Sequence, residues 1–238
     1  MCGRYRLARK KQILAETFDV DNDVEWSPRY NVAPGQNVPV IRQDAARPLR
    51  SISLARWGLI PFWAKDAKAG YKMINARAET VAGTPAFRDP FRSRRCLIPA
   101  DAFYEWSKEG KQKSPFCFSM ADDSIFAFAG IWDRWRNPDT EWVETCSIIT
   151  TSANTLLSGI HNRMPVILQR EDYDLGSRTQ SRRCASAAMR LVLTERYRAG
   201  VTIRSQARQR GVQTCISVRL QIMVAVQAYF GPVTAAGT

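Results

Sequence analysis

Cysteine is the second residue of the chain, directly after the initiator methionine. Cys2 is small enough for Met1 to be removed, and removal would leave a free α-amine and a thiol on adjacent carbons. Such a 1,2-aminothiol condenses with an aldehyde to an imine, and the thiol then closes a five-membered thiazolidine. The α-amine has a reference pKa of about 7.7–8.0, so a useful fraction is neutral and nucleophilic near pH 7. The plainer interpretation is a small, inert cysteine near a terminus.

Two further segments carry polar side chains suited to catalysis. Asn75 and Arg77 stand in a turn expected between a strand and a helix, where the amide could hydrogen-bond a reacting oxygen and the guanidinium could hold a phosphate. Glu105 lies within an aromatic run, residues 103–106, where loss of water would raise its pKa toward the range useful for proton transfer. The alternatives are ordinary turn residues and a glutamate that faces outward from an alternating strand.

His161 lies in a loop bounded by Gly159 and Pro165, and a histidine in that setting can act as a general acid. The alternative is a histidine with a purely structural role. Together with Cys2, His161 also raises the possibility of a cysteine peptidase that acts on other proteins, although the sequence offers no third member of a triad.

Arginines and aromatic residues could together form a surface that pairs phosphates and stacks bases. The alternative is a set of core aromatics with solvated arginines. The candidates are Arg4, Arg77, Arg163, Trp57, Phe62, Trp63 and Trp106.

Metal and membrane functions are disfavoured by the composition. None of the six cysteines lies within four residues of another, and the chain has a single histidine, so we expect no metal. The N-terminus lacks the apolar stretch of a signal peptide, and the longest apolar run, residues 125–132, is far shorter than the ~20 residues that span a bilayer. We expect a soluble, cytoplasmic monomer.

The charge divides the chain near residue 175. The net charge of +13 comes mostly from residues 176–238, which hold ten arginines, no lysine and one acidic residue, Glu195. We therefore predict a domain over residues 1–175 and a divergent arginine-rich tail over residues 176–238. We interpret the tail as a C-terminus read in a shifted frame and poorly ordered, and the alternative is a basic arm that binds nucleic acid.

Many short segments have strand character and few have helical periodicity. We expect an α+β fold with a mostly antiparallel, barrel-like sheet and a few short helices. The expected helices cover residues 7–18, 78–82, 153–157 and 171–175. The expected strands cover residues 38–42, 51–57, 95–98, 103–106, 116–119, 125–132, 143–150 and 166–168.

Six motifs occur in a fixed order along the chain, and in combination they resemble the SRAP family of SOS-response-associated peptidases. The resemblance covers residues 2 to about 175. The motifs are Met1-Cys2-Gly3-Arg4, Arg29-Tyr30-Asn31-Val32-Ala33-Pro34-Gly35, Arg56-Trp57-Gly58-Leu59-Ile60-Pro61, Asn75-Ala76-Arg77-Ala78-Glu79-Thr80, Phe103-Tyr104-Glu105-Trp106 and His161-Asn162-Arg163-Met164-Pro165.

The resemblance implies a sensor of abasic sites in single-stranded DNA, active in the DNA damage response. Cys2 would form a thiazolidine with the ring-opened sugar once Met1 is removed, with peptidase (hydrolase) and lyase-related chemistry and no cofactor. Asn75 would position Cys2 and the sugar, Glu105 would transfer protons, and His161 would protonate the ring oxygen. The implied DNA contacts are Arg4, Arg77 and Arg163, with Trp106 shaping the pocket.

One alternative function stays open at this point: a non-covalent single-stranded DNA-binding module, inactive because of the altered C-terminus. After residue 175 the sequence lacks the helical stretch and strand with which the family normally continues.

Overall fold

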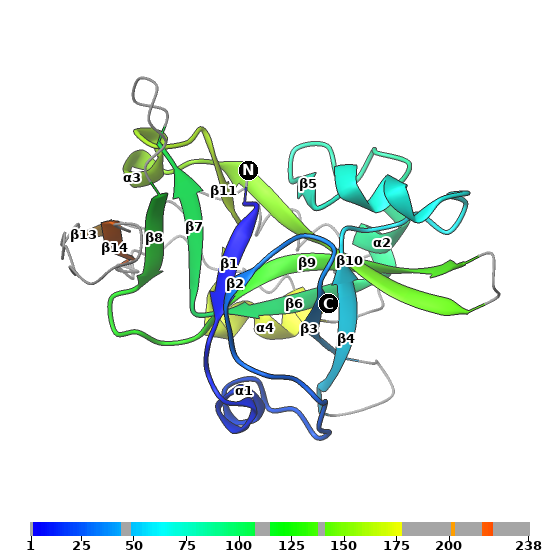
Figure 1. Cartoon of the computed structure of the whole chain (residues 1–238), viewed down its shortest axis with the longest axis horizontal. Helices are drawn as coiled ribbons and strands as arrows, with labels where there is room; N and C mark the ends of the chain where they lie inside the picture. Colours follow the sequence, from blue (N-terminus) through cyan, green and yellow to red (C-terminus); the bar gives the residue numbers. More distant parts are fainter. Residues whose placement is uncertain are drawn as a thin grey trace, which may run out of the picture.

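Two β-sheets form the body of the protein, with short helices around them (Figure 1). The structure is a computed structural model, and it describes residues 2–43, 49–107, 115–137, 141–177, 201–202 and 216–220. The expected α+β class with a barrel-like, mostly antiparallel sheet is confirmed.

The larger sheet closes into a five-stranded barrel. The strands pair in the order β10-β4-β3-β6-β9, and β9 pairs again with β10 to complete the ring. All of these pairs are antiparallel except β10 with β4, where Thr145 lies opposite Arg56. The bounds are β3 Asn37–Arg42, β4 Ser51–Trp57, β6 Arg95–Ala100, β9 Phe126–Arg136 and β10 Trp142–Ser152.

Strand β10 runs past the closed ring, and two short strands flank its far half. Strand β5 (Asn75–Arg77) pairs in parallel with residues 148–150. Strand β11 (Arg163–Pro165) pairs antiparallel with residues 150–152. The extension of β10 therefore brings the segment that begins at Asn75 and the segment that begins at Arg163 to one place. A further short strand, β12 (Ile167–Leu168), pairs with β9.

The smaller sheet carries the N-terminus. Its order is β13-β14-β8-β7-β1-β2, and β1 lies between β2 and β7. The two motif segments at the N-terminus and around Glu105 are therefore neighbours, with Arg4 opposite Tyr104. The bounds are β1 Arg4–Leu7, β2 Arg29–Val32, β7 Ala102–Trp106, β8 Pro115–Met120, β13 Val201–Thr202 and β14 Ile216–Leu220.

The helices are few and short, as expected. They are α1 Lys11–Phe18, α2 Arg88–Ser93, α3 Thr155–Ser158 and α4 Tyr173–Ser177, with 3-10 helices η1 Ala67–Lys72 and η2 Arg170–Asp172. The helix expected over residues 78–82 is wrong, because those residues form turns. Strands β1 and β2, which pair with each other, were not predicted from the sequence.

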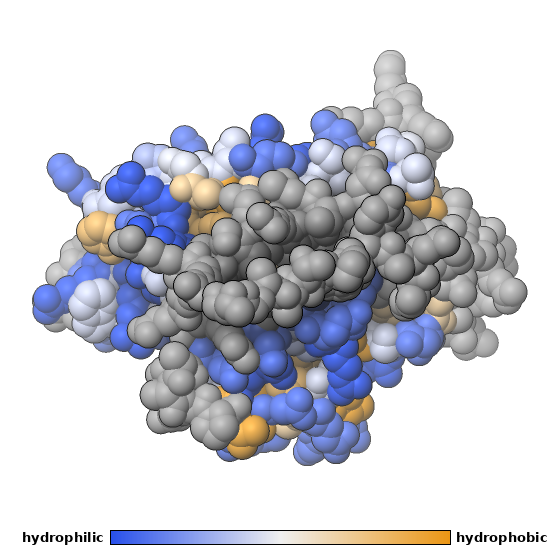
Figure 2. Space-filling model, turned by 180° about the vertical axis from the view of Figure 1, so that it is seen from behind, coloured by the Kyte–Doolittle hydropathy of each residue, from blue (hydrophilic) through white to orange (hydrophobic). Residues whose placement is uncertain are grey.

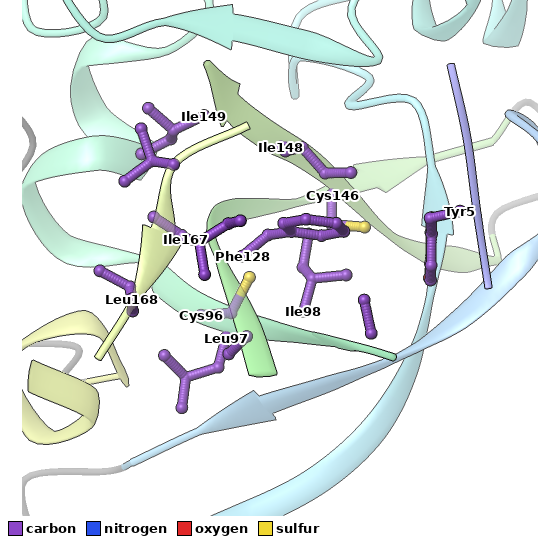
Figure 3. Close-up of a cluster of buried hydrophobic side chains, with 14 of the residues drawn as sticks. Tyr5, Cys96, Leu97, Ile98, Phe128, Cys146, Ile148, Ile149, Ile167 and Leu168 are labelled. Carbon is purple, nitrogen blue, oxygen red and sulfur yellow. The ribbon is translucent and has the colours of Figure 1, made fainter. Parts of the chain in front are cut away.

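The core lies between the barrel strands and β1. Figure 3 shows Tyr5 of β1 directed toward Phe128, and their rings meet edge to face with centroids 5.7 Å apart. Tyr5 also contacts Trp57, so one N-terminal side chain joins the two sheets. The rear face, in contrast, is mainly hydrophilic over the described residues, with small separate apolar areas (Figure 2).

Most of the predicted tail lies outside the described residues. Within it the structure describes two strands that the sequence did not predict, β13 and β14, and β14 pairs in parallel with β8. The shifted-frame origin of the tail stays a prediction. Translation of the coding DNA in its other two frames tests it.

Gly58 and Gly70 bring two backbone segments into contact just before the Asn75 strand. Gly58 has a φ of +128°, and a Cβ added there would lie 2.7 Å from the carbonyl oxygen of Gly70. Nearby, Trp57 Nε1 donates to the carbonyl oxygen of Ile74 at 2.9 Å. This close approach therefore sets where the polypeptide enters β5.

We expect Gly58→Ala to lower the free energy of unfolding by about 1–3 kcal/mol, because the new methyl group meets backbone at an unfavourable φ. The urea midpoint measures the loss. Gly83→Ala is the control, since its nearest atom would be 3.9 Å away. Equal urea midpoints for the two variants would show that the contact between the backbones at Gly58 and Gly70 does not require glycine at position 58.

Candidate functional site

Cys2 is fully buried at the start of the smaller sheet. Asn75 Nδ2 donates to the carbonyl oxygen of Cys2 at 2.9 Å, which ties the N-terminus to β5. Burial raises the pKa of the Cys2 thiol well above its usual range, and the negative charge of Glu105 raises it further. The thiol therefore stays protonated at neutral pH, and Glu105 lies close enough to act on it electrostatically.

Glu105 is buried, so the interpretation of an outward-facing strand residue is wrong. It alternates with Tyr104 on β7 and shares the inner face with Phe103, which stacks on Phe118. Desolvation raises the pKa of Glu105 to about 6. The sequence predicted this shift from the aromatic surroundings, and a carboxyl group with this pKa both accepts and returns protons near neutrality.

Asn75 begins β5, opposite Ile148 of β10. Its Nδ2 is occupied by Cys2, whereas its Oδ1 is buried with no hydrogen-bond partner among the described residues. An unpaired buried acceptor costs about 1–3 kcal/mol, so the arrangement is unfavourable unless a donor binds there. The strand-to-helix turn expected at Asn75 and Arg77 is a short strand followed by turns.

His161 precedes β11 in the loop after α3. The backbone N–H of Arg163 donates to His161 Nδ1 at 2.9 Å. The side chain of Arg163 is largely buried and forms two hydrogen bonds to the carboxylate of Glu79, at 2.8 and 2.9 Å. The segments that carry His161 and Asn75 thus lie on opposite edges of β10. Asn75 begins β5, which pairs directly with β10, and His161 comes two residues before β11, which pairs with the other edge.

The remaining predicted contacts differ in exposure. Arg77 is exposed, and Arg4 and Trp106 are half-buried. Arg4 donates to the carbonyl oxygen of Gly3 at 3.0 Å. The ladder between β1 and β7 ends at Arg4, which lies opposite Tyr104, so Cys2 and Trp106 each lie two residues beyond the last pair.

The aromatic residues expected to form a stacking surface differ in exposure. Phe62 and Trp63 are 66% and 57% exposed, as a base-stacking role requires. Trp57 is wrong for this surface, since it is buried under the segment that leads to β5. Tyr71, at 61% exposure with Arg56 over its ring, is an exposed aromatic that the sequence analysis did not single out.

Glu79 is the residue that sequence reasoning missed. It was quoted within a motif but given no role, and its bidentate pair with Arg163 spans 84 positions of sequence. Only the three-dimensional pairing of β5, β10 and β11 brings the two side chains together. Among the described residues no cluster of three or more His, Cys, Asp or Glu could hold a metal ion.

Residues 1–199 match the sequence model of one protein family, which is described as SOS response associated peptidase (SRAP). The chain belongs to this family. The match runs beyond residue 175, where the sequence analysis placed the end of the domain. No helix in the described part of this SRAP chain is long and apolar enough to span a membrane.

Similar proteins carry one recurring name. The abasic site processing protein YoqW of Bacillus subtilis is 47% identical over 176 residues, which cover 72% of this chain and 78% of YoqW. The abasic site processing protein HMCES of Xenopus tropicalis is 30% identical over 182 residues, 65% of this chain and 54% of HMCES.

Solved structures show the same fold. A protein from Bacteroides thetaiotaomicron matches with a TM-score of 0.70 and 30% identity, covering 79% of this chain and 86% of that chain. A protein from Bordetella bronchiseptica matches with a TM-score of 0.65 and 30% identity over 72% of this chain and 86% of that one.

The buried Glu105 predicts a specific pH dependence of stability. Its pKa rises from 4.5 to about 6 on folding, so the folded protein binds the proton more tightly than the unfolded chain. This contribution is fully present below about pH 4.5 and is lost as the pH rises through about 6, a change of about 2 kcal/mol. We expect Glu105→Gln to remove it. Urea unfolding at pH 4.5 and pH 7 measures the difference.

Glu16→Gln, at an exposed position of α1, is the control for this experiment. Parallel pH profiles for the wild-type protein and Glu105→Gln would show that the carboxyl group is not desolvated in the folded state.

Proposed function

We propose that this protein processes abasic sites in single-stranded DNA by forming a covalent thiazolidine through Cys2. The observation that carries the proposal is the joining of Cys2 to Asn75 by a hydrogen bond, beside the buried carboxyl group of Glu105. The names of the relatives support it, since YoqW and HMCES are both called abasic site processing proteins. The partner is DNA that contains an abasic site.

The chemistry begins with hydrolysis of the bond between Met1 and Cys2, which consumes one water and frees the α-amine. The amine attacks the aldehyde carbon of the ring-opened sugar and releases water to give an imine. The thiol then adds across the C=N bond, forming a carbon–sulfur bond while its proton passes to nitrogen. Because an imine at an abasic site invites β-elimination and strand scission, capture by sulfur protects the strand.

The pKa directions suit this order of events. The raised pKa of the buried Cys2 thiol disfavours a free thiolate, so the amine is the first nucleophile and sulfur follows. Glu105, with a pKa of about 6, is mostly ionised at pH 7 and accepts a proton from the amine. In this scheme Asn75 holds the Cys2 backbone and His161 assists opening of the sugar ring. Peptidase activity is then the removal of Met1.

A denaturing gel tests the function. Purified protein is mixed with single-stranded DNA that carries one abasic site, beside intact DNA and a Cys2→Ala variant. We expect a heat-stable shifted band that requires both Cys2 and the abasic site. The mass of the N-terminus is measured on the same sample, because retained Met1 keeps the nitrogen as an amide.

A missing band from folded protein without Met1 would overturn the covalent function. It would favour the second candidate, a non-covalent single-stranded DNA-binding module. The exposed Phe62, Trp63 and Tyr71 favour that candidate, since aromatic platforms stack bases without sequence preference. A peptidase acting on other proteins is less well supported, because the buried, protonated thiol of Cys2 is a poor nucleophile.

Arg77 is proposed to contact the DNA backbone, which predicts a salt effect. Each phosphate contact on single-stranded DNA contributes about 0.7 to the slope of log K against log salt concentration. We expect Arg77→Gln to weaken binding to intact single strands and to reduce the slope by about 0.7. Fluorescence anisotropy over a salt series measures both.

Arg170→Gln is the matched control, because this exposed arginine contacts the carbonyl oxygen of Thr17 at the end of α1. If Arg77→Gln and Arg170→Gln give equal slopes, Arg77 makes no phosphate contact.

A further inference from the structure

The guanidinium of Arg163 connects the two segments that flank β10. Its two terminal nitrogens bond the two carboxylate oxygens of Glu79 at 2.8 and 2.9 Å, and Nη2 also donates to the carbonyl oxygen of Thr150 at 2.7 Å. The same Thr150 oxygen accepts the backbone N–H of Ala78 at 2.8 Å. Since a bidentate arginine–carboxylate pair fixes direction as well as distance, Arg163 is held tightly against the turn that follows β5.

The backbone of Arg163 in turn fixes His161. Its N–H lies 2.9 Å from His161 Nδ1, and its carbonyl oxygen lies 3.2 Å from the same nitrogen. An amide hydrogen cannot leave its nitrogen, so the shorter contact requires a lone pair on Nδ1. A neutral imidazole that accepts at Nδ1 carries its proton on Nε2.

We infer that Glu79 and Arg163 are positioning residues that hold His161 as the neutral tautomer protonated on Nε2. The role of this tautomer rests on the proposed function: a neutral imidazole polarises an oxygen by donating a hydrogen bond, here to the ring oxygen of the abasic sugar. This assignment gives Arg163 a task that differs from the phosphate contact expected from the sequence.

Backbone hydrogen bonds and the Arg163 side chain together hold the loop that carries His161. The strand has only three residues, Arg163–Pro165, and Arg163 itself is its first residue. The ladder to β10 begins there, opposite Ser152, and two backbone hydrogen bonds hold the preceding loop: His161 N–H donates to the carbonyl oxygen of Leu157 at 2.7 Å, and Ala153 N–H donates to that of Asn162 at 3.1 Å. The Arg163 side chain adds a further constraint by anchoring this end of β11 to Glu79.

A simple structural ion pair is the competing explanation. Glu79 is 40% exposed, and exposed pairs contribute little to stability. Stability alone therefore cannot distinguish the two explanations, whereas the ring tautomer can.

His161 is the only histidine in the chain, so its ring can be observed without assignment. The full-length protein is prepared with ¹⁵N-labelled histidine, and long-range ¹H–¹⁵N correlation spectra are recorded at pH 7.5 without DNA. We expect a pyridine-type shift for Nδ1 and a pyrrole-type shift for Nε2. The opposite pattern, or two protonated nitrogens, would overturn the inference, and this result does not depend on whether the protein forms adducts.

Glu79→Gln and Arg163→Lys test the positioning role. Each keeps a polar side chain of similar length but breaks the bidentate pair, so we expect both ring shifts to move toward the average of the two tautomers. Glu16→Gln is the matched control and should give the wild-type pattern. Wild-type chemical shifts of the His161 ring in both variants would contradict the positioning role and leave the Glu79–Arg163 pair as a structural ion pair.

Adduct formation gives an independent readout. If the wild-type protein forms the covalent band, we expect Glu79→Gln to slow it by about tenfold, because misplacing a catalytic group by a fraction of an ångström costs rate. Glu16→Gln should react at the wild-type rate. An unchanged rate in Glu79→Gln, beside altered ring shifts, would show that the Nε2 proton has no part in the reaction.

Discussion

Strand β10 is the constraint on which the site depends, because one continuous strand serves two purposes. Its first half closes the barrel by pairing with β9 and β4. Its second half holds β5 on one edge and β11 on the other. A strand anchored at one end in a closed ring cannot shift register without breaking the ring. The positions of Asn75 and Arg163 are therefore determined by the packing of the barrel, through β10, rather than by their own short strands.

Burial of the reactive groups opposes stability. A desolvated carboxylate and an unpaired amide oxygen are both less favourable inside the protein than in water. They stay in place because the surrounding aromatic packing is extensive: Phe103 stacks on Phe118, and Tyr5 packs against Trp57. Strain of this kind is concentrated where chemistry occurs, and the neighbouring core compensates for it.

The sequence predicted the long barrel strands well, because each is a run of alternating or continuous apolar residues bounded by turns. Among the strands near the site it failed for β1, β2, β5 and β11, which are only three or four residues long and pair with partners distant in sequence. Among the site residues, the raised pKa of Glu105 could be predicted from its aromatic neighbours. The burial of Trp57 and the pair of Glu79 with Arg163 could not, since both depend on which strands lie together.

The parallel seam between β4 and β10 has a consequence for the time course of folding. The ring closes only when a strand ending at residue 57 meets one beginning at residue 142, so closure requires a contact of long sequence separation and is intrinsically slow. All five barrel strands lie before residue 153. During synthesis the ring can therefore close before the arginine-rich segment is complete. The only described strand pairing between that segment and the earlier part of the chain, β14 with β8, then adds to the edge of a sheet that already exists.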